Sequence, residues 1–337
     1  MGPTGRHRIV QLHPTRRCNL RCLHCYSESG PDVREELSSE LVCGLLEDAA
    51  AEGYTVAGFS GGEPLLYRAL PEALDRAHAC GLVTTVTTNG MPLTDTRIAQ
   101  LVGRADLLAI SLDGVPSSHN RMRANGRAFE GMAARLDAVR RSGIPFGFIF
   151  TLTQHNLDEL DWVATFAHEQ GARLLQIHPL EEVGRARQRL RGQQPDAVES
   201  TFAQLEAVRL RERFGDAMLV QVDIADGMRI RNQPDRVFAT APAEGDAPLA
   251  ELLSPLVVET DGTVVPLQHG FSRAYALGNL HDARLPELAG DWRRERLPAF
   301  HRLCGQALEE HDTRDGARFF NWYELVSAVA DGEPARG

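Results

Sequence analysis

The feature that most constrains the fold is an alternation of short apolar segments with amphipathic segments over residues 9–181. The apolar segments have the length of buried strands, and the amphipathic ones place apolar side chains at helical spacing. Strands that alternate with helices usually lie parallel and are joined by right-handed crossovers. The six expected strands are 10–12, 55–59, 83–88, 107–112, 146–153 and 174–178. Periodicity alone leaves open whether they form a barrel, a partial barrel or a doubly wound sheet.

Helices are expected between these strands. Residues 41–52 and 70–80 are expected helices, and each is followed by a glycine, which is a common helix stop signal. Apolar residues recur at helical spacing over 129–139, which predicts one further helix. Asn156, with Glu159 three residues later, is typical of a pair that caps the start of a helix.

The strand–helix alternation stops after about residue 184. A helix over 197–213 and a strand over 218–224 are expected next, followed by a loop at 239–248 that is rich in Ala and Pro. Two apolar runs within 256–265, separated by Asp-Gly, predict a hairpin, and the remainder reads as helical.

Composition excludes several classes of function. The net charge of −10 argues against general binding to a nucleic-acid backbone. All 36 basic residues are arginine, so chemistry that needs a Schiff-base lysine or a Walker-loop lysine is excluded. No segment approaches 18 consecutive apolar residues, and the N-terminal residues lack the apolar core of a signal peptide. We therefore expect a cytoplasmic protein with no membrane partner.

Three of the six cysteines lie within eight positions, directly after the first expected strand. Cys18, Cys22 and Cys25 are spaced so that one loop can bring them to a single inorganic core. Iron–sulfur clusters normally take four cysteines, so a cluster held by three keeps one iron open for chemistry. The alternatives are a structural zinc site completed by His13 or His24, and three unrelated core cysteines.

Three further motifs each lie at the end of an expected strand. They are Ser60-Gly61-Gly62-Glu63-Pro64, Thr87-Thr88-Asn89-Gly90 and Ser111-Leu112-Asp113-Gly114. Together with Cys-x3-Cys-x2-Cys followed by Tyr, they resemble the radical S-adenosylmethionine (SAM) superfamily, over about residues 8–187. The resemblance implies an α/β fold, a partial (β/α)6 TIM-like barrel, with the active site at the C-terminal ends of its strands.

The resemblance also implies a role for each motif. Cys18, Cys22 and Cys25 would hold one [4Fe–4S] cluster whose open iron binds SAM. Glycines permit a close backbone approach, a carboxylate accepts from an ammonium group, and a guanidinium suits a carboxylate. The SAM contacts would be Gly61, Gly62 and Glu63 at the amino group, Ser111 and Asn89 at the ribose or carboxylate, Arg123 at the carboxylate and His24 beside the adenine.

Within the superfamily, the sequence around the cysteines is similar to the branch of haem-biosynthesis and peptide-modifying maturases. Many of these carry a C-terminal SPASM or twitch extension that holds auxiliary clusters. Here Leu267 stands where the family pattern places a cysteine, and Cys304 is the only cysteine in the C-terminal half. We expect a single cluster and three regions: a core barrel over 1–187, a connecting region over 188–250, and a smaller α+β extension without a cluster over 251–337.

The activity that the resemblance implies is reductive cleavage of SAM to methionine and a 5′-deoxyadenosyl radical. This radical would abstract hydrogen from a peptide or natural-product precursor, with a flavodoxin or ferredoxin as reductant. Without an auxiliary cluster, redox-neutral outcomes such as epimerisation, rearrangement or decarboxylation are favoured. A haem-type tetrapyrrole is the alternative substrate, and a cluster-bearing scaffold or binding protein is the alternative of another class.

The residues that would contact the substrate are not assigned by any of these motifs. His178 ends the sixth expected strand and is a catalytic candidate, although a packed rim histidine would look the same. Gln268 and His269, just past the hairpin, are similar candidates. Cys304 could donate a hydrogen atom to a substrate radical, or be a buried inert thiol. Arginines recur over 185–191 and could steer an acidic substrate, or form the exposed face of a linker.

Overall fold

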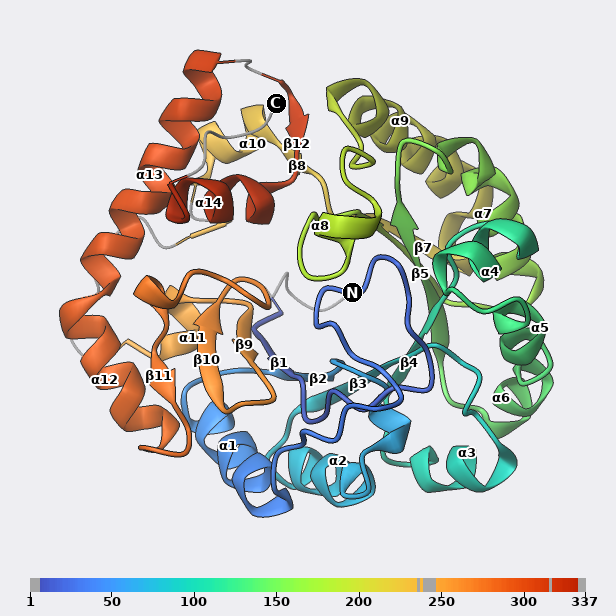
Figure 1. Cartoon of the computed structure of the whole chain (residues 1–337), viewed down its shortest axis with the longest axis horizontal. Coiled ribbons are helices and arrows are strands. Elements are labelled where there is room, and N and C mark those ends of the chain that lie inside the picture. The colour runs from blue at the N-terminus through green and yellow to red at the C-terminus, as the bar shows by residue number, and fades with distance from the viewer. Residues whose placement is uncertain (1–6, 235–236, 239–246, 315–316, 333–337) are drawn as a thin grey trace.

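The computed structural model describes residues 7–234, 237–238, 247–314 and 317–332. Its main element is one ten-stranded sheet in the order β11-β10-β9-β1-β2-β3-β4-β5-β6-β7. The sheet curls, and most helices lie on its outer side (Figure 1). Strands β11 and β7 are its two edges, so the sheet is not closed and forms a partial barrel.

The barrel strands run parallel and follow one another in chain order. This order confirms the expected partial barrel, since a doubly wound sheet would reverse its strand order at a switch point. A seventh parallel strand, in the segment expected as a strand over 218–224, pairs with β6. The strands are β1 (Ile9–Leu12), β2 (Val56–Phe59), β3 (Val83–Thr88), β4 (Leu107–Ser111), β5 (Phe146–Leu152), β6 (Leu174–Pro179) and β7 (Leu219–Val222).

Helices cover the outer face of these strands. Side chains that point outwards are completely buried, as Leu175 and Ile177 are in β6, whereas the alternate residues Gln176 and His178 are only half-buried. The helix expected over 129–139 is two helices, α5 and α6. The helices are α1 (Ser39–Ala51), α2 (Leu70–Ala79), α3 (Asp95–Leu101), α4 (Pro116–Met122), α5 (Ala128–Ala133), α6 (Leu136–Ser142), α7 (Leu160–Glu169), α8 (Ala186–Arg189), α9 (Ala197–Phe214) and α10 (Gly227–Asn232).

The interpretation of Asn156 and Glu159 as a helix-capping pair is wrong. The Asn156 side chain accepts from the Thr153 amide at 2.7 Å and donates to the Thr151 carbonyl at 2.8 Å. The Glu159 carboxylate accepts from the Val115 amide at 2.8 Å instead of turning back to its own helix. Asn156 therefore bonds to the end of the preceding strand, and Glu159 bonds to a residue that is distant in the sequence.

The C-terminal segment extends the same sheet. Strand β9 (Leu256–Val258) pairs parallel with β1, and β10 (Thr263–Pro266) returns antiparallel to β9, as the predicted hairpin requires. Strand β11 (Gly278–Asn279) follows, and β8 (Ala225–Asp226) pairs with β12 (Phe319–Phe320) in a separate small sheet. The remaining helices are α11 (Leu249–Leu252), α12 (Leu285–Glu295), α13 (Leu297–Arg314) and α14 (Trp322–Ala330). Most of the expected loop over 239–248 lies outside the described residues, as do residues 1–6.

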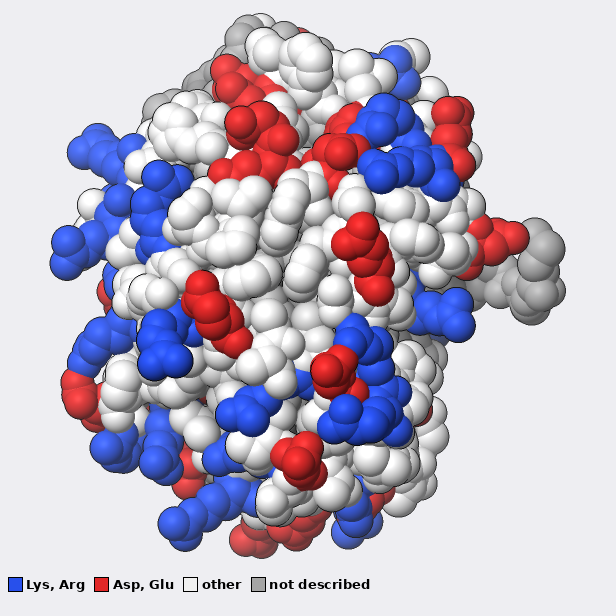
Figure 2. Space-filling model, turned by 90° about the vertical axis from the view of Figure 1, so that its right-hand side faces the viewer, with Lys and Arg blue, Asp and Glu red and all other residues white. Residues whose placement is uncertain are grey.

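In the described part of the chain, no helix is both long and apolar enough to cross a membrane. On the face formed by the right-hand side of Figure 1, acidic and basic side chains are interspersed with uncharged ones (Figure 2). Neither charge forms a continuous stripe on this face.

Candidate active site at the ends of the barrel strands

The cysteine loop, residues 13–30, follows β1 and brings the three cysteines together. Cys18 and Cys22 are 8% exposed, Cys25 is half-buried, and the three pack with Leu20 and Met91. Burial, followed by the charge of the nearby Glu63, raises the pKa of the Cys18 thiol to about 12. A cationic core that binds all three thiolates would offset this cost, because a coordinating thiol is deprotonated by its metal.

The alternative of a zinc site completed by His13 or His24 finds no preformed ligand group here. Across the described ranges, no three His, Cys, Asp or Glu side chains converge closely enough to share one ion. A cubane cluster binds each thiolate at a different iron, so its ligands stand farther apart than those of one ion. The donor set of three thiols on one loop fits such a cluster.

The glycine motif after β2 packs directly on the cysteine loop. The Gly62 amide donates to the Thr15 carbonyl at 2.8 Å, and the Glu63 amide donates to the Arg17 carbonyl at 2.9 Å. A Cβ atom on Gly62 would lie 2.4 Å from the Arg17 carbonyl oxygen, and Gly61 has a φ of +98°. The glycines are thus required for contact between two loops, a role that the sequence analysis missed.

The Glu63 carboxylate links the ends of β2 and β3. It is fully buried and accepts from the Thr88 hydroxyl at 2.8 Å, the Asn89 amide at 2.9 Å and the Leu65 amide at 3.2 Å. Burial raises the pKa of Glu63, and these hydrogen bonds oppose the rise. Asn89 in turn donates from its side chain to Asn19 of the cysteine loop at 2.9 Å. The glycine motif after β2, the motif that ends β3 and the cysteine loop are therefore joined by hydrogen bonds.

Arg123 lies between the cysteine loop and the end of β4. Its Nε is 2.7 Å from Oδ2 of Asp113, its Nη2 donates to Oδ1 at 3.1 Å, and its Nη1 is 3.7 Å from the Cys22 sulfur. Burial of Asp113 would raise its pKa, but the charge and hydrogen bond of Arg123, together with the nearby His24 and His119, outweigh burial and lower that pKa to about 2. Ser111, the last residue of β4, is buried nearby. The Arg123–Asp113 pair was not foreseen, since the sequence analysis assigned Arg123 only to the carboxylate of SAM.

A cavity of about 240 Å³ opens beside this ion pair. Asn156 lines it and donates to the Asp113 carbonyl at 3.2 Å, so the loops after β4 and β5 are tied together. Leu23 of the cysteine loop contributes an apolar wall. The neighbouring His24 is half-buried, and burial lowers its pKa to about 4, so its imidazole is neutral at neutral pH.

His178 stands at the end of β6 between two carboxylates. Its Nδ1 is 3.2 Å from Asp223, and its Nε2 is 3.8 Å from Glu181. Burial alone would lower the pKa of His178, but the hydrogen bond with Asp223 and the charges of Glu181 and Asp223 raise it to about 9. The imidazole is therefore cationic at neutral pH, which suits a proton donor or an anion contact more than a general base.

A larger cavity of about 590 Å³ lies between the segment that follows β6 and the last helix. Helix α14 and strand β12 form one wall, and residues 179–200 form the other. Its ionised residues are mainly acidic: Glu181, Glu182, Asp196, Glu324 and Asp331 against Arg187 and Arg191.

The arginines over 185–191 do not act as one patch. The Arg185 amide donates to the Cys25 carbonyl at 3.0 Å, and its side chain donates to the Ser29 carbonyl at 2.5 Å. Arg189 lines the smaller cavity, and Arg187 lines the larger one. Arg185, which the sequence suggested only as part of a steering run or an exposed linker face, is thus a contact of the cysteine loop.

The remaining candidates lie in different environments. His269 contacts His13 and Tyr26 of the cysteine loop, and Gln268 donates to the Ser327 hydroxyl at 2.9 Å at the edge of the larger cavity. Cys304 is completely buried in the apolar core, and burial raises its pKa to about 12. It lines neither cavity, so its role as a hydrogen-atom donor stays a prediction.

A partial barrel with three thiols on its first loop and a glycine–glutamate turn on its second defines a radical SAM domain. Residues 12–167 match the family model described as the radical SAM superfamily. The chain carries this domain, with relatives in both the haem-synthesis and the peptide-modifying branches.

Among curated relatives, Fe-coproporphyrin III synthase of Methanosarcina barkeri is 32% identical over 165 residues, 48% of this chain and 41% of the relative. The sporulation killing factor maturation protein SkfB of Bacillus subtilis is 27% identical over 211 residues, 61% of this chain and 50% of the relative. The chain thus spans about half the length of the curated relatives it matches.

Among solved structures, SuiB of Streptococcus suis bound to S-adenosylmethionine superposes with a TM-score of 0.70 at 12% identity. The superposition covers 97% of this chain and 75% of SuiB, and it establishes the shared fold. The synthase name of the first relative, together with the radical SAM domain, supports an enzyme.

Proposed function

We propose that the chain is a radical SAM enzyme that binds one [4Fe–4S] cluster through Cys18, Cys22 and Cys25 and acts on a peptide precursor. The observation that carries this proposal is the gathering of three buried or half-buried thiols on one loop, beside the Arg123 guanidinium and an adjacent cavity of about 240 Å³. When bound, the cluster and SAM supply a 5′-deoxyadenosyl radical that can abstract hydrogen from a substrate.

In this proposal the chain's own residues bind and orient the cluster, SAM and the substrate, and they exclude water from the site. Gly62 and Glu63 fix the cysteine loop to the end of β2 through the Thr15 and Arg17 carbonyls. Arg123 pairs with the buried carboxylate of Asp113, which favours the charged form of the guanidinium, and it places positive charge next to Cys22. The cavity of about 240 Å³, between the loops after β4 and β5, would receive the nucleoside of SAM, with His24 as a neutral neighbour.

The larger cavity supports a peptide substrate. Its volume of about 590 Å³ suits several residues of an extended chain, and its walls mix carboxylates with Phe319, Phe320 and Leu325. Glu181 lines the cavity and also contacts His178, so a segment bound there would reach the end of β6. A relative named as a peptide maturation protein, and a fold neighbour solved with its precursor peptide, agree with this choice.

A tetrapyrrole is the second candidate, because relatives include Fe-coproporphyrin III synthase and pre-heme d1 synthase. The carboxylates of the larger cavity outnumber its arginines and would repel the carboxylate side chains of such a substrate. Titrating a porphyrin against the protein and following its Soret band separates the two candidates. A saturable Soret shift at micromolar porphyrin would favour the tetrapyrrole.

The experiment that tests the proposed activity uses anaerobically reconstituted protein with dithionite or a reduced flavodoxin as electron donor. We expect about four irons per chain and 5′-deoxyadenosine by mass spectrometry after SAM is added. Cys22→Ala should abolish both, whereas Cys43→Ala, a matched change in helix α1, should leave both intact. Close to eight irons per chain would contradict a single cluster. A loaded protein that forms no 5′-deoxyadenosine with any peptide would point to the scaffold alternative.

A further inference from the structure

Two aromatic rings of the cysteine loop meet a third ring from the C-terminal segment. His13 follows β1, Tyr26 follows Cys25 directly, and His269 belongs to the segment after β10. Ring centroids are 5.4 Å apart for His13 and Tyr26, 5.0 Å for His13 and His269, and 5.3 Å for Tyr26 and His269. Each ring therefore contacts both others, and we call His13, Tyr26 and His269 the aromatic triad.

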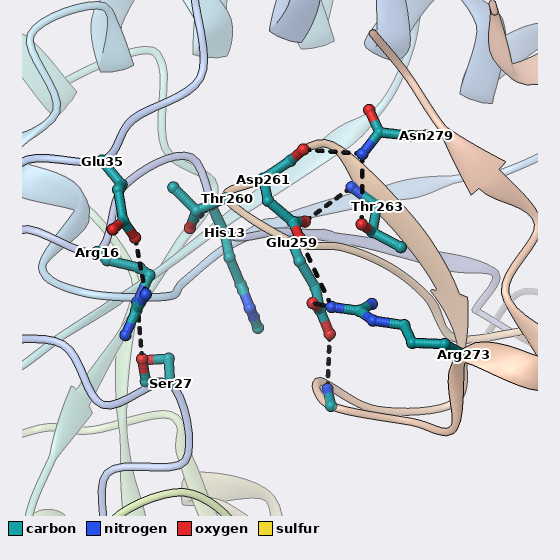
Figure 3. A network of polar contacts seen from close by, with 11 residues as sticks. His13, Arg16, Ser27, Glu35, Glu259, Thr260, Asp261, Thr263, Arg273 and Asn279 are labelled. Atoms are coloured by element: carbon teal, nitrogen blue, oxygen red, sulfur yellow. Dashed lines mark hydrogen bonds and ion pairs between the residues drawn. The ribbon is translucent and has the colours of Figure 1, made fainter. Parts of the chain in front are cut away.

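His269 is held in place by the C-terminal hairpin. The buried Glu259 carboxylate accepts from the Gly270 amide at 2.6 Å and pairs with Arg273, as Figure 3 shows. The Leu267 amide donates to the Pro255 carbonyl at 3.0 Å. His269 lies between these anchored neighbours, so its ring is presented to the cysteine loop from a fixed backbone.

The two other rings are anchored on the barrel side. The Tyr26 hydroxyl is 3.0 Å from the Ser60 hydroxyl, which belongs to the glycine motif after β2. The His13 carbonyl accepts from the Thr260 hydroxyl at 2.7 Å (Figure 3). A side chain of the hairpin therefore also contacts the backbone at the start of the cysteine loop. The hairpin therefore contacts both ends of the segment that carries the three thiols.

Cys25 is the thiol that most needs such support. It is half-buried, whereas Cys18 and Cys22 are almost completely buried. Its neighbour Tyr26 is the residue through which the aromatic triad reaches the third thiol. Loss of the His269 ring would remove two of the three ring contacts and free Tyr26 on one side.

We infer that His269 is a positioning residue: its ring packs on His13 and Tyr26 and so holds the Cys25 segment in the conformation that binds a cluster. The C-terminal segment thereby contributes to cluster binding without supplying a ligand. This inference rests on the proposed function only in that the bound group is a cluster.

The first test is made on the metal-free full-length chain, by quantifying iodoacetamide modification of Cys25 with mass spectrometry. His269→Ala should speed modification of Cys25 by about tenfold, because two ring contacts are lost. His269→Phe keeps a stacking ring and should stay within about twofold of the wild type. His281→Ala, a change at an exposed histidine of the same segment, is the matched control and should have no effect.

Two results would overturn the inference: a wild-type modification rate in His269→Ala, or a rate in His269→Phe as high as in His269→Ala. If circular dichroism shows that His269→Ala is unfolded, Tyr26→Leu removes a ring from the barrel side and is judged by the same expected increase, with Tyr26→Phe as its conservative partner. A Tyr26→Leu rate equal to that of the wild type would then overturn the inference.

The second test is made on the reconstituted protein, by following iron transfer to a chelator and the EPR spectrum of the reduced cluster. His269→Ala should lose iron several-fold faster than the wild type, and the double variant with Tyr26→Leu should lose it no faster than the quicker single variant. Additive effects would contradict a shared contact. A wild type that holds no iron would overturn the proposed function, whereas the alkylation result on metal-free protein would still decide the role of His269.

Discussion

The guanidinium of Arg123 and the carboxylate of Asp113 form an ion pair that is almost fully removed from solvent, with Nε 2.7 Å from Oδ2. The same guanidinium lies 3.7 Å from the sulfur of Cys22. One acidic residue at the end of β4 thus determines where a permanent positive charge stands relative to the thiol site. A substitution that breaks this ion pair should therefore affect both the stability of the fold and the charge beside Cys22.

Asp113→Asn should strongly destabilise the fold, because it leaves the buried Arg123 charge without a counterion. We expect a loss of about 3–5 kcal/mol in the free energy of unfolding, measured by urea denaturation. Asp137→Asn breaks an exposed pair with Arg140 and should cost less than about 1 kcal/mol. If both substitutions changed the free energy of unfolding equally, the buried pair would stabilise the fold no more than the exposed pair does.

Gly62→Ala should displace the cysteine loop, because its Cβ would lie 2.4 Å from the Arg17 carbonyl oxygen. The expected result is a large drop in iron bound per chain after reconstitution, measured by a colorimetric iron assay. Gly126→Ala is the control, since a Cβ there meets no atom within 4 Å. Normal iron content in Gly62→Ala would refute the close contact between the two loops.

Glu63→Gln should weaken the link between β2 and β3, because an amide nitrogen cannot accept from the Thr88 hydroxyl or the Asn89 amide. Leaving one buried donor unpaired costs about 1–3 kcal/mol, which thermal or urea unfolding would detect. Glu72→Gln, at an exposed residue that accepts from Ser39, should be close to neutral. A neutral Glu63→Gln would mean that the carboxylate is not needed for this link.

Stability should depend on pH through His178. The pKa of His178 is raised to about 9 in the folded chain from an ordinary value of 6.5, so its pairing with Asp223 stabilises the fold fully below pH 6.5. That contribution is lost as the pH rises through 9. The side chain is 37% exposed, so screening limits the loss to about 1 kcal/mol.

The measurement for His178 is the free energy of unfolding at pH 6 and at pH 10. His178→Gln should remove about 1 kcal/mol of the difference between the two values, whereas His281→Gln, at an exposed histidine, should leave it unchanged. A His178→Gln variant with the wild-type pH dependence would contradict a cationic His178.

Local patterns predicted most of the barrel. Strand β3 was expected over 83–88, where the structure has it, because alternation of side chains and β-branched composition act within a few residues. The capping interpretation failed because the Asn156 side chain turns back to the end of β5 and donates to the Asp113 carbonyl, while Glu159 accepts from the Val115 amide. A pattern of local spacing cannot anticipate competitors that are remote in the sequence.

The sequence by itself determined that three thiols at gaps of four and three residues come from one loop, and that short strands alternate with helices over most of residues 9–181. Only the tertiary structure decided that Asp113 faces Arg123, that Gly62 packs on the cysteine loop, and that the C-terminal hairpin adds to β1 and places His269 against Tyr26. The physical reason is that thiol spacing and strand periodicity are properties of neighbouring residues. The charge pair, the glycine contact and the aromatic triad arise only when segments up to about 250 residues apart are packed together, because burial and close approach depend on the whole fold.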